Sequence, residues 1–258
     1  MGRRLFDRLP RGVAPTAVAD DLAAATMPHV DTLDGAVRAA LAGAHDIAGT
    51  LFLGGPADFL AAKVIGALAP ATAQAVRVRV RFGLPAEVGD ALVRGDLDLA
   101  VVGAPVRQRG IEIEPLYIEQ LVLVVPPPGR AGWYARPRRA PTNIADTLAA
   151  MPLVAYGDDL PLLRRYWRSA FGRRLRRDPA VTVPDLRWVV AACTAGMGIT
   201  VLPRYLCERE LATSELIELH TSTTPPTNQL SLAWRSGAVH HPRVAYVRDL
   251  LLAASPGW

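Results

Sequence analysis

Apolar residues follow two different rhythms along this chain, one before residue 49 and one after it. In the first part they recur three and four residues apart, which is the spacing of a coiled-coil seam: Val30, Leu33, Val37, Leu41 and Ala44. This spacing predicts a long helix over 16–44 that begins with Thr16 as its N-cap. Pro28 lies within the range, so we expect it to kink the helix or to divide it into two pieces.

A long helix with a single apolar stripe needs a surface that covers the stripe. We expect a second chain to supply that surface, so that the protein forms a homodimer or a tetramer. The alternative is an amphipathic helix that folds back onto its own domain.

After residue 49, short apolar runs alternate with amphipathic segments. Helices are predicted over 58–68, 86–94, 160–171, 186–195, 204–211 and 242–254. Strands are predicted over 50–54, 76–82, 97–102, 153–156, 180–183, 199–202, 215–219 and 230–234, and two more strand-like runs lie within 111–126. Such an alternation is typical of an α/β fold with a mostly parallel sheet covered on both faces.

The segment 76–82 differs from the other strands because valine and arginine alternate along it. Its arginines cannot all lie under a helix, so we expect an edge strand with one solvated or partner-facing side. A basic stripe can also indicate nucleic acid, but a solvated edge explains it more simply.

Two proline clusters, at 126–129 and 221–227, are expected to mark the points where the chain crosses between two lobes. Lobe 1 would hold 49–125 and 228–258, and lobe 2 would hold 126–227, with 130–141 as a basic loop. The pattern therefore predicts a two-lobed α/β protein with two crossover linkers. We expect a small ligand in the cleft between the carboxyl ends of strands from both lobes.

Composition sets outer bounds on these predictions. The chain has 258 residues, of which 50% are hydrophobic, so it is long enough for two cores. Its net charge of +5 is mild support for a polyanionic partner. No apolar run is long enough to span a membrane, and the first residues lack the apolar core of a signal peptide. Cys193 and Cys207 form no CxxC motif, so we expect a reduced, cytoplasmic protein without a membrane partner.

Residues that could carry catalysis are few. The five histidines are scattered and form no HExxH motif or ligand set with the cysteines, so no metal, cofactor or enzymatic activity is expected. His240 and His241 are interpreted as an exposed helix start, and Cys193 as a small buried residue. Gly196 and Gly198 follow a helix and precede a strand, which indicates a helix C-cap and not a dinucleotide site.

The first fifteen residues predict a basic hairpin. Arginines surround an apolar pair, and a Pro-Arg-Gly turn leads to the helix start. The order of residues resembles the wing of the winged helix-turn-helix in LysR-type transcriptional regulators, and these positions carry the likeness: Gly2, Leu5, Phe6, Arg8, Arg11, Gly12, Val13 and Thr16. An arbitrary arginine-rich terminus is the alternative.

The rest of the chain resembles the effector-binding domain of the same family, which has the type II periplasmic-binding-protein fold. The likeness rests on the segments 49–54, 92–100, 121–125 and 195–203. It implies a wing remnant over 1–15, a linker and dimerisation helix over 16–48 and an effector-binding domain over 49–258. It also implies that the base-reading helix lies outside this sequence, so specific DNA binding is expected to be weak or absent, with these wing residues left to contact DNA: Arg3, Arg4, Arg8 and Arg11.

The resemblance places the effector at strand ends and helix starts of both lobes. In lobe 1 the implied residues are Gly55, Pro56, Ala57, Asp58, Gly83, Leu84, Gly103, Ala104 and Pro105. In lobe 2 they are Tyr156, Gly157, Asp158, Arg187 and Thr200. Many relatives have Ser or Thr after the first strand, where this chain has Gly-Pro-Ala-Asp, and Asp58 is suited to cap the following helix. An anion there would repel a carboxylate, so a neutral, cationic or phenolic effector is favoured, or none.

Seven arginines between 164 and 177 form the strongest basic cluster. A nucleic-acid or membrane surface is conceivable, but a solvated helix face or a dimer contact is the preferred interpretation.

The leading hypothesis is a LysR-family transcriptional regulator in which a small metabolite changes how paired chains sit on DNA. Three alternatives stay open: a truncated regulator that dimerises without reading DNA, a solute-binding protein of an import system, and an enzyme on the same two-lobed fold.

Overall fold

The computed structural model describes residues 3–9, 12–42, 47–83, 85–103, 109–130, 144–220 and 225–258. Contacts divide the chain into two compact units. Unit 1 comprises Met1–Tyr117 and Gln229–Trp258, and unit 2 comprises Ile118–Asn228.

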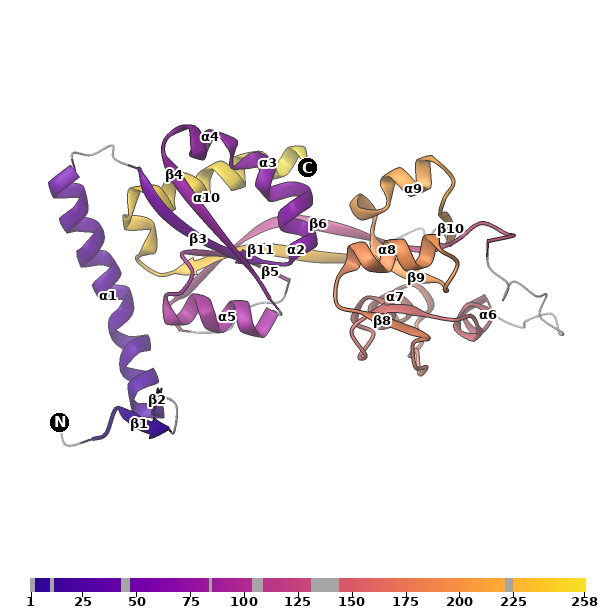
Figure 1. Ribbon diagram of the computed structural model, residues 1–258, viewed down its shortest axis with the longest axis horizontal. Coiled ribbons are helices and arrows are strands. Elements are labelled where there is room, and N and C mark those ends of the chain that lie inside the picture. Colours follow the sequence, from indigo (N-terminus) through magenta and orange to yellow (C-terminus); the bar gives the residue numbers. More distant parts are fainter. Residues whose placement is uncertain are drawn as a thin grey trace. The chain divides into compact units, whose positions relative to one another are not determined.

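The chain begins with the predicted basic hairpin and long helix. Strands β1 (Phe6–Leu9) and β2 (Gly12–Pro15) pair antiparallel and lead into α1 (Ala17–Ala42) (Figure 1). The Thr16 hydroxyl accepts a hydrogen bond from the amide of Ala19 at 3.3 Å, which confirms its role as the N-cap.

Pro28 does not divide α1, which runs through it as one continuous helix. A proline removes one backbone hydrogen bond. Here the loss is offset by an alanine-rich sequence, since alanine has the highest helix propensity.

One face of α1 packs on the rest of unit 1. The Arg235 Nε donates a hydrogen bond to the Asp31 carboxylate at 2.7 Å. Gly35 is buried, and a Cβ there would lie only 3.2 Å from the backbone of His240. The helix therefore contacts its own domain along this face, but the described residues of the apolar stripe stay exposed, so this contact does not cover the stripe as the alternative interpretation requires.

The sheet of unit 1 contains three parallel strands. β3 (Gly49–Gly55) pairs in parallel with β4 (Val76–Phe82) and with β5 (Leu99–Val102). β11 (Thr227–Arg235) pairs antiparallel to β5, and β4 lies at the end of the strand order. The edge position predicted for the valine–arginine strand is thus confirmed.

Helices cover both faces of this sheet. α5 (Pro85–Arg94) lies on one side, and α3 (Ile65–Ala67), α4 (Ala69–Ala73) and α10 (Pro242–Ala254) lie on the other (Figure 1). The helix predicted over 58–68 forms three joined pieces, α2 (Ala57–Phe59), the π-helical turn η1 (Leu60–Val64) and α3. Short 3-10 turns η3 (Ala238–His240) and η4 (Ser255–Gly257) flank α10.

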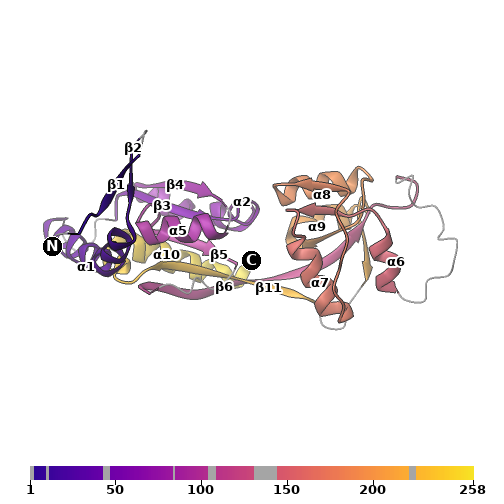
Figure 2. The ribbon, with the colours of Figure 1, turned by 90° about the horizontal axis from the view of Figure 1, so that it is seen from below.

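The two strand-like runs expected within 111–126 form one long strand, β6 (Ile111–Val125). The boundary between the units lies inside β6, between Tyr117 and Ile118, and again inside β11, between Asn228 and Gln229. The sequence predicts the first crossing at the prolines of 126–129, but these follow the end of β6. Both strands are continuous from one unit into the other (Figure 2).

Unit 2 is built on the second half of β6. β9 (Thr200–Pro203) and β10 (Ile217–His220) pair antiparallel to it, while β7 (Val154–Tyr156) and β8 (Val181–Val183) pair in parallel with each other. The helices are α6 (Ile144–Ala150), α7 (Pro161–Phe171), α8 (Leu186–Thr194), η2 (Arg204–Leu206) and α9 (Glu208–Ala212).

Alternate residues of β6 supply two cores in unit 2. Leu121 and Leu123 pack in a cluster with Trp167 of α7, whereas Val122 and Val124 pack in a cluster with Cys193 of α8. Successive side chains of a strand point to opposite faces, so both faces of this sheet are covered. The predicted α/β architecture is confirmed.

The glycines after α8 have two separate causes. Gly196 has a φ of 87°, its amide donates to the carbonyl of Cys193, and the next amide donates to that of Ala192. This is a Schellman motif, and it confirms the predicted helix C-cap. Gly198 is required for another reason: a Cβ there would overlap the carbonyl group of Pro152.

Candidate ligand-binding site

The described residues of lobe 1 that are expected to bind a ligand lie at one edge of the unit 1 sheet. Gly55 ends β3, Gly83 follows β4 and Gly103 follows β5. Because these strands are parallel, their carboxyl ends meet at the same edge. The structure thus brings the three glycines together, while Leu84, Ala104 and Pro105 lie outside the described residues.

The helix after β3 begins earlier than the sequence suggests. Pro56 is its N-cap residue, Ala57 is the first helical residue, and Asp58 lies within the first turn. The prediction that Asp58 caps this helix is therefore wrong, because the fixed φ of Pro56 places the start of the helix before it. The half-buried Asp58 carboxylate still lies where the helix dipole stabilises a negative charge.

In unit 2, Tyr156 ends β7 and Thr200 begins β9. The two residues line one small hollow together with Leu160 and Leu186. Thr200 is only 1% exposed, so its hydroxyl is largely enclosed by the protein. The structure therefore brings these two predicted residues together, with Tyr156 the more accessible of the pair.

The loop after β7 holds the next two predicted residues. Gly157 has a φ of 77°, which favours glycine, and the exposed Asp158 accepts a hydrogen bond from Thr182 of β8 at 3.0 Å. This bond holds the Asp158 carboxylate at the carboxyl end of the β7–β8 pair.

Arg187 lies in the first turn of α8 and is held by a residue that sequence reasoning missed. Asp185 is the N-cap of α8, and its carboxylate accepts hydrogen bonds from the backbone amide and the side chain of Arg187 at 2.8 and 2.9 Å. The Arg187 side chain is the main cause that lowers the pKa of Asp185. An Asp at the position before a helical run is an N-cap signal that could have found it.

Neither cysteine is available for chemistry. Cys193 and Cys207 are both 0% exposed, and burial raises the pKa of each thiol to about 12. A thiol is nucleophilic only as its thiolate, so these groups are inert. Among the described residues, no group of three or more His, Cys, Asp or Glu is placed to hold a metal ion.

The basic hairpin presents three described arginines to solvent. Arg3, Arg4 and Arg8 are exposed, and Arg4 lies 3.9 Å from the carboxylate of Asp7. Arg11 lies outside the described residues. In the part of the chain that the structure describes, no helix is long and apolar enough to cross a membrane.

Comparison with known proteins gives a family match over most of the chain. A family model described as the LysR substrate binding domain matches residues 44–256. The HTH-type transcriptional regulator AbaB of Streptomyces antibioticus is 36% identical over 265 residues, which cover 100% of this chain and 86% of AbaB. A probable hydrogen peroxide-inducible genes activator of Mycobacterium leprae is 30% identical over 149 residues, covering 57% of this chain and 46% of that protein.

Solved structures share the fold at lower identity. The match with ArgP from Mycobacterium tuberculosis has a TM-score of 0.78 at 20% identity, and it covers 98% of this chain and 82% of the ArgP chain. The match with full-length LysG from Corynebacterium glutamicum with bound effector Arg has a TM-score of 0.76 at 19% identity, and it covers 99% of this chain and 84% of the LysG chain.

Proposed function

Because this chain belongs to the LysR family of transcriptional regulators, we propose that it binds a small-molecule effector through the strand-end residues of its two units. The gathering of Gly55, Gly83 and Gly103 at one edge of the unit 1 sheet is the observation that carries the proposal. Ligands of open α/β sheets bind outside the carboxyl ends of the strands. The protein acts by binding and not by catalysis, and we place it in the cytoplasm.

The effector we propose is a cation. Asp58 lies half-buried in the first turn after β3, at the edge where the strand ends of unit 1 meet. A carboxylate there favours a positively charged ligand and disfavours an acidic one. LysG, a distant neighbour, was solved with bound effector Arg, which makes L-arginine a reasonable first probe.

Calorimetric titration with three probes tests this class. L-arginine is expected to bind, whereas L-citrulline, its neutral isostere, and L-glutamate are expected to bind at least about tenfold more weakly, as removal of one charge-assisted hydrogen bond implies. Asp58→Asn should weaken L-arginine binding by a similar factor. The exposed Asp90→Asn on α5 is the matched control and should leave binding unchanged. Tighter binding of L-glutamate than of L-arginine would overturn the cationic class, and equal loss of affinity in both variants would remove Asp58 from the site.

The exposed stripe of α1 supports pairing of two chains. Val30, Leu33 and Val37 are 55%, 67% and 54% exposed, although α1 packs on unit 1 along another face. An uncovered apolar stripe of this length favours association. Light scattering should show a dimer or larger assembly for the wild type and a shift towards monomer for Leu33→Asn. Ala25→Asn, which adds the same side chain at an exposed position off the stripe, should leave the assembly intact. A monomeric wild type would overturn the pairing.

The hairpin arginines are proposed to contact DNA phosphates, which carry no sequence information. A triple variant R3Q/R4Q/R8Q should therefore weaken binding to duplexes of any sequence and reduce its salt dependence. Effector binding would then shift the population of paired chains between two arrangements on DNA. We do not propose peroxide sensing, although one relative is a probable hydrogen peroxide-inducible genes activator, because both thiols are buried and protonated.

A further inference from the structure

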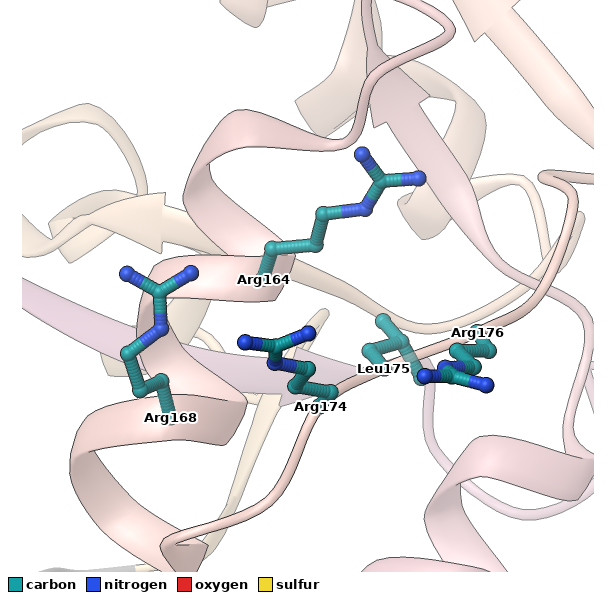
Figure 3. A pocket seen from close by; sticks show the side chains of 5 residues that line it. All are labelled: Arg164, Arg168, Arg174, Leu175 and Arg176. Carbon is teal, nitrogen blue, oxygen red and sulfur yellow. The ribbon is translucent and has the colours of Figure 1, made fainter.

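The arginine cluster of unit 2 is arranged around a pocket. Arg164 and Arg168 lie four residues apart on α7 and therefore on the same side of the helix. α7 ends at Gly172, which has a φ of 64°, and the chain then continues as an extended segment. This segment contributes Arg174 and Arg176 to the same pocket (Figure 3).

The pocket has a defined floor and a small volume. Leu175 is 4% exposed and packs in the core cluster with Leu163 and Trp167, so it anchors the segment that carries the two later arginines. The cavity holds about 240 Å³ and is lined by Leu175 and the four arginines. Pockets for drug-sized ligands hold roughly 300–1,000 Å³, so this one suits a more compact molecule.

Within the part of the chain that the structure describes, no ion pair neutralises the charge of the pocket. Two neighbouring arginines have other partners. Arg173 donates a hydrogen bond to the Asp146 carboxylate at 2.9 Å, and Arg165 donates one to the Asn228 side chain. By contrast, no described Asp or Glu forms an ion pair with the four lining arginines: Arg164, Arg168, Arg174 and Arg176. Two acidic groups line adjoining hollows, Asp159 with Arg164 and Arg168 and Asp146 with Arg174 and Arg176, and neither forms an ion pair with these four arginines.

Like charges held around a concavity repel one another and focus a positive potential into it. A solvated helix face would spread its guanidinium groups outward, and it would not enclose a floor as buried as Leu175. The planar guanidinium matches the two oxygens of a phosphate or carboxylate group. An anion with several such groups would relieve the repulsion and fill the hollow.

We propose that this pocket binds a compact polyanion, a molecule with two or more phosphate or carboxylate groups, through Arg164, Arg168, Arg174 and Arg176. The site goes beyond the proposed effector site and shares no residue with it. It assigns a ligand to the seven-arginine segment, for which the sequence favoured only a solvated face or a dimer contact.

Calorimetric titration of the full chain at about 0.15 M salt, where exposed charges are screened, is the test. The probes are tripolyphosphate, citrate, orthophosphate and a short DNA duplex. Tripolyphosphate or citrate is expected to bind more tightly than orthophosphate, and the stronger of the two identifies the phosphate or the carboxylate source. The double variant R168Q/R174Q should weaken that binding by at least about tenfold for each charge-assisted hydrogen bond that it removes.

The control variant is R77Q/R79Q, which removes the same charge from the exposed edge strand of unit 1 and should leave affinity within about twofold. Equal losses of affinity in both variants would show a general attraction to net charge and would overturn the site. Absence of tripolyphosphate and citrate binding to the wild type would also overturn it. Binding of the duplex alone, abolished by R168Q/R174Q, would replace the compact polyanion with a nucleic-acid backbone.

Discussion

The contact between Asp31 and Arg235 makes a sharp prediction about how the long helix is held. The Arg235 side chain is only 7% exposed, and its NH1 also donates to the carbonyls of Leu92 and Leu97 at 2.9 and 2.7 Å. Asp31 is 22% exposed and provides the only carboxylate paired with Arg235 among the described residues. Asp31→Ala therefore leaves a buried positive charge with two neutral acceptors.

The size of the effect follows from these interactions. Removing one partner of a fully buried ion pair costs about 3–5 kcal/mol. Because Asp31 is partly exposed and two carbonyls remain, we expect about 2–3 kcal/mol, near the value of one charge-assisted hydrogen bond. The destabilisation falls on the docking of α1 against unit 1, so amide exchange in α1 should accelerate by about 30- to 150-fold.

Hydrogen exchange followed by mass spectrometry measures this directly, at one fixed protein concentration because the chain is proposed to associate. Asp21→Asn, an exposed acidic position on the same helix, is the control and should exchange like the wild type. In a double-mutant cycle with Arg235→Met, the coupling energy should reach at least about 1 kcal/mol. If amides of α1 in Asp31→Ala exchange within about twofold of the wild-type rate, the change is no larger than that of an ordinary surface substitution, and the reasoning is refuted.

Three more outcomes follow from unit 2. Gly198→Ala should lower the free energy of unfolding by about 3 kcal/mol, because the new Cβ would overlap a backbone carbonyl; a decrease under about 0.5 kcal/mol in urea titration would show that this strand can shift. Burial raises the pKa of Cys193 and Cys207 from 9.0 to about 12, so the fold favours the neutral thiols and stability should fall as pH rises through that window. The variant C193A/C207A should flatten that decline, and an unchanged slope would contradict the cause. Asp185→Ala should cost about 1 kcal/mol at neutral pH because it removes the helix cap. Because Arg187 lowers the pKa of Asp185 from 3.8, the Asp185 carboxylate stabilises the fold at pH values above 3.8, and this stability is lost as the pH falls through the lowered pKa. A difference in unfolding free energy between the wild type and Asp185→Ala that does not change with pH would contradict this cause.

Local patterns in the sequence predicted most of the elements. The strict alternation over 76–82 identified an edge strand, and the Gly196 cap followed from a glycine placed directly after a helical run. Periodicity failed where two neighbouring signals competed. Asp58 carries a cap signal, but Pro56 starts the helix before it. The apolar runs of 111–126 form one strand, although they resemble two, because Pro115 within β6 does not end it.

The candidate site was predictable only in part. Parallel strands oblige Gly55, Gly83 and Gly103 to share an edge, so their grouping follows once the strand order is known. The role of Asp185 in holding Arg187 was missed although its place before a helical run signals an N-cap, because the resemblance pointed to Arg187 alone. The burial of Thr200 was also unforeseen, because it depends on packing around β9.

The sequence by itself determined the α/β alternation, the basic hairpin, the long capped helix and the resemblance to one family of regulators. Each of these is encoded in windows of a few to a few tens of residues, where periodicity and turn chemistry act locally. The tertiary structure alone decided which distant groups meet. Asp31 and Arg235 are 204 positions apart, and only the folded chain brings them to hydrogen-bonding distance. The arginines of 164–177 are a run of charge in the sequence, but the turn at Gly172 and the buried Leu175 place four of them around one pocket.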